Sequence, residues 1–242
     1  MIHQYHHVIA GRIYREAETC LRASMLEKPG FSGRRLASIS VLLQNALRDL
    51  MKTYNGEFLT RSELEALGVI CEGDDVSVHK SVVIINPEGL RLGNHVRIDP
   101  FCVLSATKSI RLHDRVHIAG HCTLMGGGGI EFEPYTGASH GAVIISAADD
   151  FTGRYLAGPM VAEHLRSVHK APVILKRYSM IGAAAVVLPG VTLAEGSIVG
   201  AHSYARKSIP EWTIWFGVPA KQVAKRRKDL LKLLAAEDPQ EV

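Results

Sequence analysis

A repeat of 20 residues constrains the fold of this chain more than any other feature of its sequence. When the sequence is written in rows that begin at residues 70, 90, 110 and 130, apolar side chains fall into six columns. The columns are Ile70, Leu90, Ile110, Ile130; Glu72, Leu92, Leu112, Phe132; Val76, Val96, Val116, Thr136; Val78, Ile98, Ile118, Ala138; Val82, Cys102, Cys122, Ala142; and Ile84, Leu104, Leu124, Ile144. Only Glu72 and Thr136 break the apolar pattern, so the rows repeat one structural unit.

The spacing within a row predicts short strands. Apolar pairs two positions apart recur every six residues, so each row holds three strands that each bury two side chains on one face. Glycine-rich or Asn-Pro segments such as 126–129 and 86–89 supply the corners. After Pro172 the pattern resumes with a step of 18, as between Leu175 and Leu193. The fold class is therefore mainly β, a parallel β-helix whose stacked cysteines Cys102 and Cys122 act as small core side chains.

Composition limits the other possibilities. The chain has 242 residues with 47% apolar content, no apolar stretch of membrane-spanning length and no secretion-signal pattern at its start, which favours a cytoplasmic protein. The formal net charge of +4 arises largely from a basic run, 221–228, near the C-terminus. Because no aromatic residues alternate with these charges, we expect no nucleic-acid partner.

Two motifs make the repeat specific. Ile181-Gly-Ala-Ala-Ala-Val-Val-Leu-Pro-Gly190 and Phe216-Gly-Val-Pro-Ala-Lys221 stand in this order at the end of the solenoid. With them the chain, over roughly 57–230, resembles the hexapeptide-repeat acyltransferases, and among them the sugar and polysaccharide O-acetyltransferases. The resemblance implies a left-handed coil and transfer of an acetyl group from acetyl-CoA to a sugar hydroxyl or amino group, including that of a nucleotide sugar. No metal cofactor is expected.

Three regions are predicted along the chain. Residues 1–56 form a helical region with an apolar stripe at helical spacing, residues 57–218 form the β-helix, and residues 219–242 form a basic C-terminal helix and tail. Residues 146–172 interrupt the repeat as an inserted loop. A loop of this length is usually functional, and Asp150, Arg154 and Tyr155 in it are candidate acceptor-binding residues. The resemblance implies that it reaches over a neighbouring subunit of a homotrimer.

The catalytic base is the open point of the sequence. Acetyl transfer needs a group that accepts the proton of the acceptor. In many members of the family this group is a histidine five residues after an interior aliphatic residue, a place that Asp149 occupies here. A solvated aspartate is a weak base, with a reference pKa of about 3.9, whereas histidine, near ~6.5, suits neutral pH. The candidate catalytic residues are therefore His117, His140 and Asp149, with Asp149 better suited to orienting a substrate or another side chain.

The CoA-binding residues follow from the motifs. Gly182-Ala183 and Gly200-Ala201 lie 18 residues apart and are expected to stack as the floor of a groove for the pantetheine arm. Cationic side chains would bind the phosphates of CoA, and the candidates are Arg206, Lys207, Lys221 and Arg226.

Two other functions fit the same solenoid. A carbonic-anhydrase-like zinc enzyme would need three histidines at a subunit interface, for which His117 and His121 offer only two. A non-enzymatic scaffold would bind no CoA.

Overall fold

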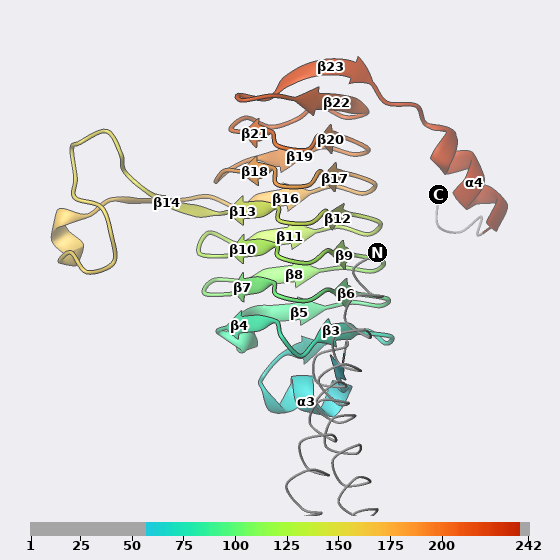
Figure 1. Cartoon of the computed structure of the whole chain (residues 1–242), viewed down its shortest axis with the longest axis horizontal. Helices are drawn as coiled ribbons and strands as arrows, with labels where there is room; N and C mark the ends of the chain where they lie inside the picture. Colours follow the sequence, from blue (N-terminus) through green and yellow to red (C-terminus); the bar gives the residue numbers. More distant parts are fainter. Residues whose placement is uncertain (1–56, 238–242) are drawn as a thin grey trace, which may run out of the picture. The chain divides into compact units, whose positions relative to one another are not determined.

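The solenoid predicted from the repeat is present. The computed structural model describes residues 57–237, so the helical region expected over 1–56 and the last residues, 238–242, lie outside the described part of the chain. The described chain winds through about seven turns, and each complete turn contributes one strand to each of three sheets (Figure 1). Strands that follow one another within a sheet belong to successive turns and, along the body of the solenoid, pair in parallel.

Three sheets, named A, B and C here, form the walls. Sheet A contains β1 (Phe58–Leu59), β3 (Ser77–His79), β6 (Arg97–Ile98), β9 (His117–Ile118), β12 (Gly137–Ala138), β17 (Met180–Ile181), β20 (Ile198–Val199), β22 (Thr213–Phe216) and β23 (Lys221–Lys225). Sheet B contains β2 (Ile70–Cys71), β5 (Leu90–Leu92), β8 (Ile110–Leu112), β11 (Ile130–Phe132), β16 (Val173–Leu175) and β19 (Thr192–Leu193). Sheet C contains β4 (Val83–Ile85), β7 (Val103–Ser105), β10 (Thr123–Met125), β13 (Val143–Ile145), β18 (Val186–Val187) and β21 (Tyr204–Ala205).

The strand register confirms the two repeat lengths. Leu104, Leu124 and Ile144 pair in steps of 20 residues, and Leu175 pairs with Leu193 at a step of 18. The predicted apolar columns fill the interior of the solenoid, where most of their side chains are fully buried. Thr136 is inward as well, and its hydroxyl donates a hydrogen bond to the Glu133 carbonyl at 2.6 Å, which explains a polar residue in an apolar column.

The first turn departs from the predicted columns by one residue. Ile70 pairs with Arg91, and Cys71 pairs with Leu92, a step of 21 rather than 20. Val69 is buried and Cys71 packs against the core, so Ile70 and Glu72 do not hold the inward places assigned to them. Because a shift of one residue turns every side chain of a strand to the other face, the Glu72 carboxylate is free to bind arginines on the outer surface of sheet B.

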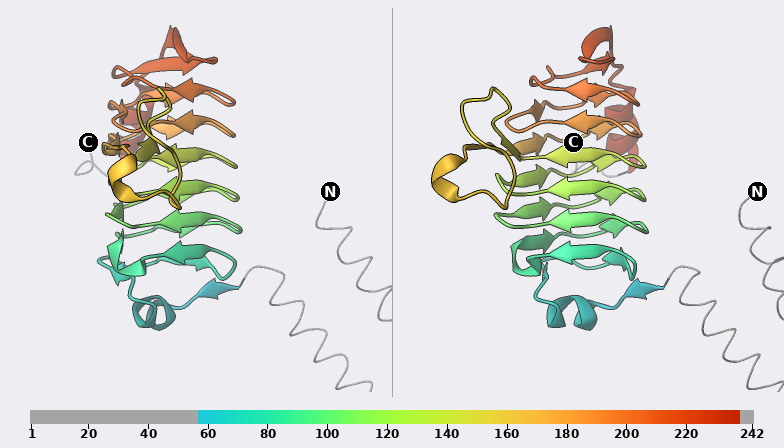
Figure 2. Two further views of the ribbon diagram at one scale, coloured as in Figure 1. Left: turned by 90° about the vertical axis from the view of Figure 1, so that its left-hand side faces the viewer. Right: turned by 60° about the vertical axis from the view of Figure 1, so that its left-hand side comes forward.

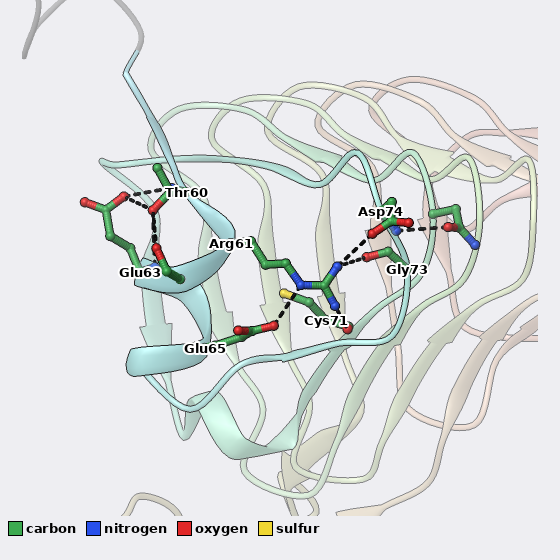
Figure 3. A network of polar contacts seen from close by, with 9 residues as sticks. Thr60, Arg61, Glu63, Glu65, Cys71, Gly73 and Asp74 are labelled. Atoms are coloured by element: carbon green, nitrogen blue, oxygen red, sulfur yellow. Dashed lines mark hydrogen bonds and ion pairs between the residues drawn. The ribbon is translucent and has the colours of Figure 1, made fainter.

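A short helix covers the first turn. Helix α3 (Arg61–Ala66) begins with a capping box between Thr60 and Glu63, and its Leu64 is fully buried in the core. The Arg61 guanidinium donates hydrogen bonds to the carbonyls of Cys71 and Gly73, which ties the helix to the first turn (Figure 3). This contact protects the end of the solenoid, as a stack of repeats requires.

The other end differs in part from the predicted basic helix. Strands β22 and β23 form an antiparallel hairpin at the last turn, and helix α4 follows only at Asp229–Glu237 (Figure 1). The C-terminal helix is therefore confirmed, while Lys221 and Lys225 lie on a strand. Among residues 57–237 the structure contains no helix long and apolar enough to cross a membrane.

The inserted segment leaves the solenoid as a two-stranded ribbon. Strands β14 (Ala147–Asp149) and β15 (Val168–Lys170) pair antiparallel, and the loop between them includes the short helix η2 (Glu163–Leu165). The ribbon follows β13 and projects away from the sheets, as Figure 1 and the right-hand view of Figure 2 show. We call residues 147–170 the excursion. The Ala171 amide donates one hydrogen bond to the Ser146 carbonyl at 3.0 Å, which closes the base of the excursion where the chain returns to the solenoid.

Candidate active site

His117 lies on the outer surface of sheet A. It is the first residue of β9, between the inward Val116 and Ile118, so its ring points away from the core as predicted, and its side chain is 51% exposed. The Nε2 atom lies 2.8 Å from Oδ2 of Asp99, which is only 14% exposed. Asp99 also accepts a hydrogen bond from Nε of Arg97 at 2.7 Å.

Asp99 is a candidate site residue that the repeat pattern alone did not predict. Burial raises the pKa of its carboxyl, but hydrogen bonds from His117 and Arg97 outweigh this effect and hold the pKa below its usual value. The charged carboxylate can fix the orientation and tautomer of the imidazole, an arrangement that suits a general base. The sequence did contain a signal for Asp99. The 20-residue step stacks His117 directly on Arg97, and Asp99, the outward residue after β6, therefore lies beside His117.

His140 lies at the corner between β12 and β13. Its side chain is exposed, and its carbonyl accepts a hydrogen bond from the Ala184 amide at 2.9 Å. Among the hydrogen bonds of residues 57–237, none joins the side chains of His117, His140 and Asp149. The three predicted catalytic residues of the chain therefore do not form a single hydrogen-bonded group, and their roles stay predictions.

Asp149 is held by the excursion itself. Its Oδ2 accepts a hydrogen bond from the Gly158 amide at 3.0 Å, and its Oδ1 lies 3.3 Å from Nη2 of Arg166. Both side chains are 22% exposed. The Gly158 amide and the Arg166 guanidinium hold the two carboxylate oxygens in a fixed orientation, which suits binding and orienting a cationic or hydrogen-bonding group.

The other predicted acceptor-binding residues also lie on the excursion. Asp150 accepts hydrogen bonds from the amide and hydroxyl of Thr152, a local turn that orders the segment after β14. Arg154 and Tyr155 follow in the exposed part of the loop. The structure therefore places Asp149, Asp150, Arg154 and Tyr155 on one projecting element.

The predicted floor of the CoA groove is more crowded than the sequence suggested. A Cβ atom on Gly182 would lie 2.4 Å from the Ala201 amide nitrogen, and one on Gly200 would lie 2.0 Å from the Phe216 ring. Both glycines are thus required where the backbone meets the next turn or an aromatic ring. Ala201 is exposed and Ala183 half-buried beside them, so the accessible part of this surface is formed by the alanines.

The predicted phosphate-binding cations have different environments. Arg206 and Lys207 are exposed directly after β21, and Lys221 is exposed on β23. Arg226 instead donates from Nη1 to the carbonyls of Tyr178 at 2.6 Å and Gly196 at 3.0 Å, and burial lowers its pKa. Its guanidinium therefore fastens the C-terminal hairpin to two corners of the solenoid.

Within the described residues, no group of three or more histidine, cysteine, aspartate and glutamate side chains is arranged to hold a metal ion. Cys71, Cys102 and Cys122 are free thiols, and the buried Cys102 and Cys122 donate weak hydrogen bonds to backbone carbonyls.

No model of a known protein family matches the chain. It is 31% identical over 183 residues to a dTDP-4-amino-4,6-dideoxy-D-glucose acyltransferase of Escherichia coli, which covers 75% of this chain and 95% of that relative. The N-acyltransferase AntD from Bacillus cereus, solved with dTDP and 3-hydroxybutyryl-CoA, superposes with a TM-score of 0.72 at 34% identity over 76% of this chain and 97% of that one. A variant of AntD, solved with dTDP-4-amino-4,6-dideoxyglucose and coenzyme A, gives a TM-score of 0.73 at 33% identity over 78% and 100% of the two chains. Repeat, motifs and these similarities agree, and the chain belongs to the hexapeptide-repeat β-solenoid acyltransferases.

Proposed function

We propose that this acyltransferase moves an acyl group from acyl-CoA to the amino group of a dTDP-linked aminosugar. The observation that carries the proposal is the similarity, along nearly the whole length of AntD, to structures that hold both CoA and dTDP-4-amino-4,6-dideoxyglucose. The sequence left a hydroxyl and an amino acceptor open, and this similarity favours the amine. The acyl group is either acetyl or a longer chain such as the 3-hydroxybutyryl group bound in AntD.

The spacing of two substituted positions supports a role for Asp149. Solved variants of AntD replace either a serine or an aspartate, and these positions are ten residues apart. In the present sequence only Ser139 and Asp149 form a serine–aspartate pair with this order and spacing. Ser139 lies at the corner after β12, next to His140, and Asp149 lies at the end of β14. We assign both residues to the region that contacts the reacting groups.

The residues can be given roles in direct transfer. The amine nitrogen attacks the thioester carbon, the C–S bond breaks, coenzyme A leaves as the thiol and the nitrogen loses one proton. His117, oriented by Asp99, accepts that proton and then donates it to the departing sulfur, with His140 as the other candidate. The Asp149 carboxylate holds the amino group, and Asp150, Arg154 and Tyr155 contact the rest of the acceptor. Ala183 and Ala201, with the backbone of Gly182 and Gly200, line the pantetheine arm, while Arg206, Lys207, Lys221 and the unbound donors of Arg226 face the CoA phosphates.

We also propose a left-handed coil and a homotrimer, as the family resemblance implies. The outer surface of sheet C supports the oligomer. Its outward side chains include Val83 and Ile85 on β4 and Met125 on β10, which are 51%, 45% and 39% exposed. In the corresponding column of sheet B, Ile70 is followed by the arginines Arg91 and Arg111. An apolar face of this kind is typical of a contact between subunits, and the excursion would then reach a neighbouring subunit.

The function is tested by following thiol release from acetyl-CoA and 3-hydroxybutyryl-CoA with a dTDP-aminosugar as acceptor, and with dTDP-glucose as the hydroxyl control. We expect release with the aminosugar only. His117→Ala should lower kcat about 10²–10⁴-fold, the usual range for loss of a general base. Asp149→Ala should lower kcat about 10²-fold, because the amino group is no longer held in position against the thioester. His121→Ala, an exposed corner histidine, serves as the matched control. Thiol release with dTDP-glucose alone would contradict the proposed amine acceptor, and full activity of His117→Ala would exclude that residue as the base.

A further inference from the structure

A pocket on the outside of the solenoid is lined by none of the residues to which a catalytic or binding role was assigned above. It has a volume of about 310 Å³ and lies where sheet C passes into sheet B. One wall is the outward column of sheet B, in which Arg91, Arg111, Glu131 and Ile174 stack on successive turns. The other wall is made by the corners at 108–109 and 128–129 and by Pro172, which follows the base of the excursion.

Cations dominate the charge of this pocket. Arg91, Lys108 and Arg111 line it against the single carboxylate of Glu131. The two arginines share the Glu72 carboxylate, with one guanidinium nitrogen each at 3.2 and 3.0 Å, so most of their N–H donors stay available. Lys108 is exposed, and within residues 57–237 it has no carboxylate partner. Even when Glu72 is counted, three cations face two anions, and the pocket keeps a net positive charge.

The lining of the pocket places hydrogen-bond donors beside an apolar surface. Gly128 packs closely against the next turn, because a Cβ atom there would lie 2.1 Å from the Ser146 carbonyl oxygen, so this corner of the pocket is formed by backbone alone. The Ser109 side chain lies beside this corner, 3.4 Å from the Cβ position of Gly129, and offers a hydroxyl. Pro172 and Ile174 supply apolar surface. Two stacked guanidinium groups with a lysine and a hydroxyl are the donors that proteins use to bind phosphate.

We propose that this pocket binds the phosphate groups of a nucleotide, with the nucleoside against Pro172 and Ile174. The inference rests on the proposed function, which supplies two possible nucleotides: the dTDP part of the acceptor and the nucleotide end of CoA. Both present a diphosphate to the same cations. None of the residues assigned to CoA phosphates lines this pocket, and Pro172 connects it with the excursion, where the acceptor-binding residues lie.

The test measures binding rather than transfer. Isothermal titration of the full-length protein with dTDP and, separately, with coenzyme A gives the Kd of each. We expect Lys108→Glu to weaken one of the two ligands at least tenfold and to leave the other within twofold. Lys108 has no ion pair to lose, so the variant should fold normally. Lys232→Glu on helix α4, which makes the same charge change outside the pocket, is the matched control and should leave both Kd values unchanged.

A selective loss for dTDP assigns the pocket to the acceptor, and a selective loss for CoA assigns it to the donor. The double variant Lys108→Gln/Arg111→Gln should weaken the same ligand further. The inference is overturned if Lys108→Glu binds both ligands as the wild type does, if Lys232→Glu weakens them equally, or if the wild-type protein binds neither. Because binding is measured without transfer, a protein that binds dTDP through Lys108 and releases no thiol would refute the proposed function alone.

Discussion

One inward column of sheet A holds buried hydroxyl groups with and without hydrogen-bond partners, and the comparison shows how a single buried atom affects the solenoid. Thr136 and Ser197 occupy equivalent places in sheet A, separated by the turn that contains Ser179. The Thr136 hydroxyl donates to the Glu133 carbonyl, whereas the Oγ atoms of Ser179 and Ser197 are buried without a hydrogen-bond partner. A buried hydroxyl without a partner costs roughly 1–3 kcal/mol.

We therefore predict opposite effects of removing these two hydroxyls. Ser197→Ala should raise the free energy of unfolding by about 1 kcal/mol, because it removes an unpartnered group. Thr136→Val should lower it by about 1 kcal/mol, because the Glu133 carbonyl loses its donor. Urea denaturation of the two variants and the wild type measures both changes. A loss of stability in Ser197→Ala would show that the serine hydroxyl does have a partner.

The Asp99 carboxyl gives a prediction about pH. Its pKa is lowered in the folded protein, so its contribution to stability is present above the unfolded value, about 3.9, and is lost as the pH falls through the folded value. Asp99→Asn should lower the free energy of unfolding at pH 7 and have a smaller effect near pH 3. In addition, the pH profile of kcat should change in Asp99→Asn, because His117 loses its carboxylate partner. A stability difference between the two proteins that does not depend on pH would contradict the assigned ion pairs.

At the scale of elements, the excursion is attached to the solenoid at a narrow base. Ala147 pairs with Lys170, Ala148 pairs with His169, and the Ser146 and Ala171 backbones meet next to the sheets. Everything beyond Ala148 and His169 lies outside the core, and it exposes Phe151 (84%) and Met160 (96%). The excursion therefore contributes little to the stability of the solenoid and can be devoted to binding.

Replacing residues 149–168 by Asn-Gly, which closes an antiparallel pair with a tight turn, tests this separation. We expect the shortened protein to keep its melting temperature within about 5 °C, while acyl transfer to the aminosugar falls below detection, because Asp149 to Tyr155 are removed. CoA binding, measured by calorimetry, is the control and should remain. Unfolding of the shortened protein, or retention of activity, would refute the role given to the excursion.

At the scale of the whole molecule, the three outer faces have different chemistry. Sheet A carries Arg97 and His117, and sheet B carries Arg91 and Arg111 beside the pocket. Sheet C exposes apolar side chains on β4 and β10. The helix α3 and the β22–β23 hairpin close the two ends of the described solenoid. Association of copies is thus expected through a side wall and not end to end.

Charges on sheet C should prevent this association. The double variant Val83→Lys/Ile85→Lys is predicted to be monomeric in light scattering. A trimer of this variant would bury six lysines, two from each subunit, at apolar contacts. Ser77→Lys on the outer surface of sheet A is the control and should leave the trimer intact. Activity of the monomeric variant should also fall if the excursion completes the site of a neighbour. A wild-type protein that is monomeric at assay concentration would refute the trimer.

Four features could be predicted from the order of residues alone: the solenoid, the change of step from 20 to 18, the position of the excursion and the outward direction of His117. These features depend on the two-residue alternation of strands and on corner residues, which are local properties of the chain. The contacts between outward groups of different turns became visible only in the folded chain. They are Asp99 with His117, Glu72 with two arginines after a shift of one residue, Phe216 over Gly200, and Arg226 on two distant carbonyls. Such contacts depend on the length of each corner and on side-chain direction, which a periodic pattern does not contain.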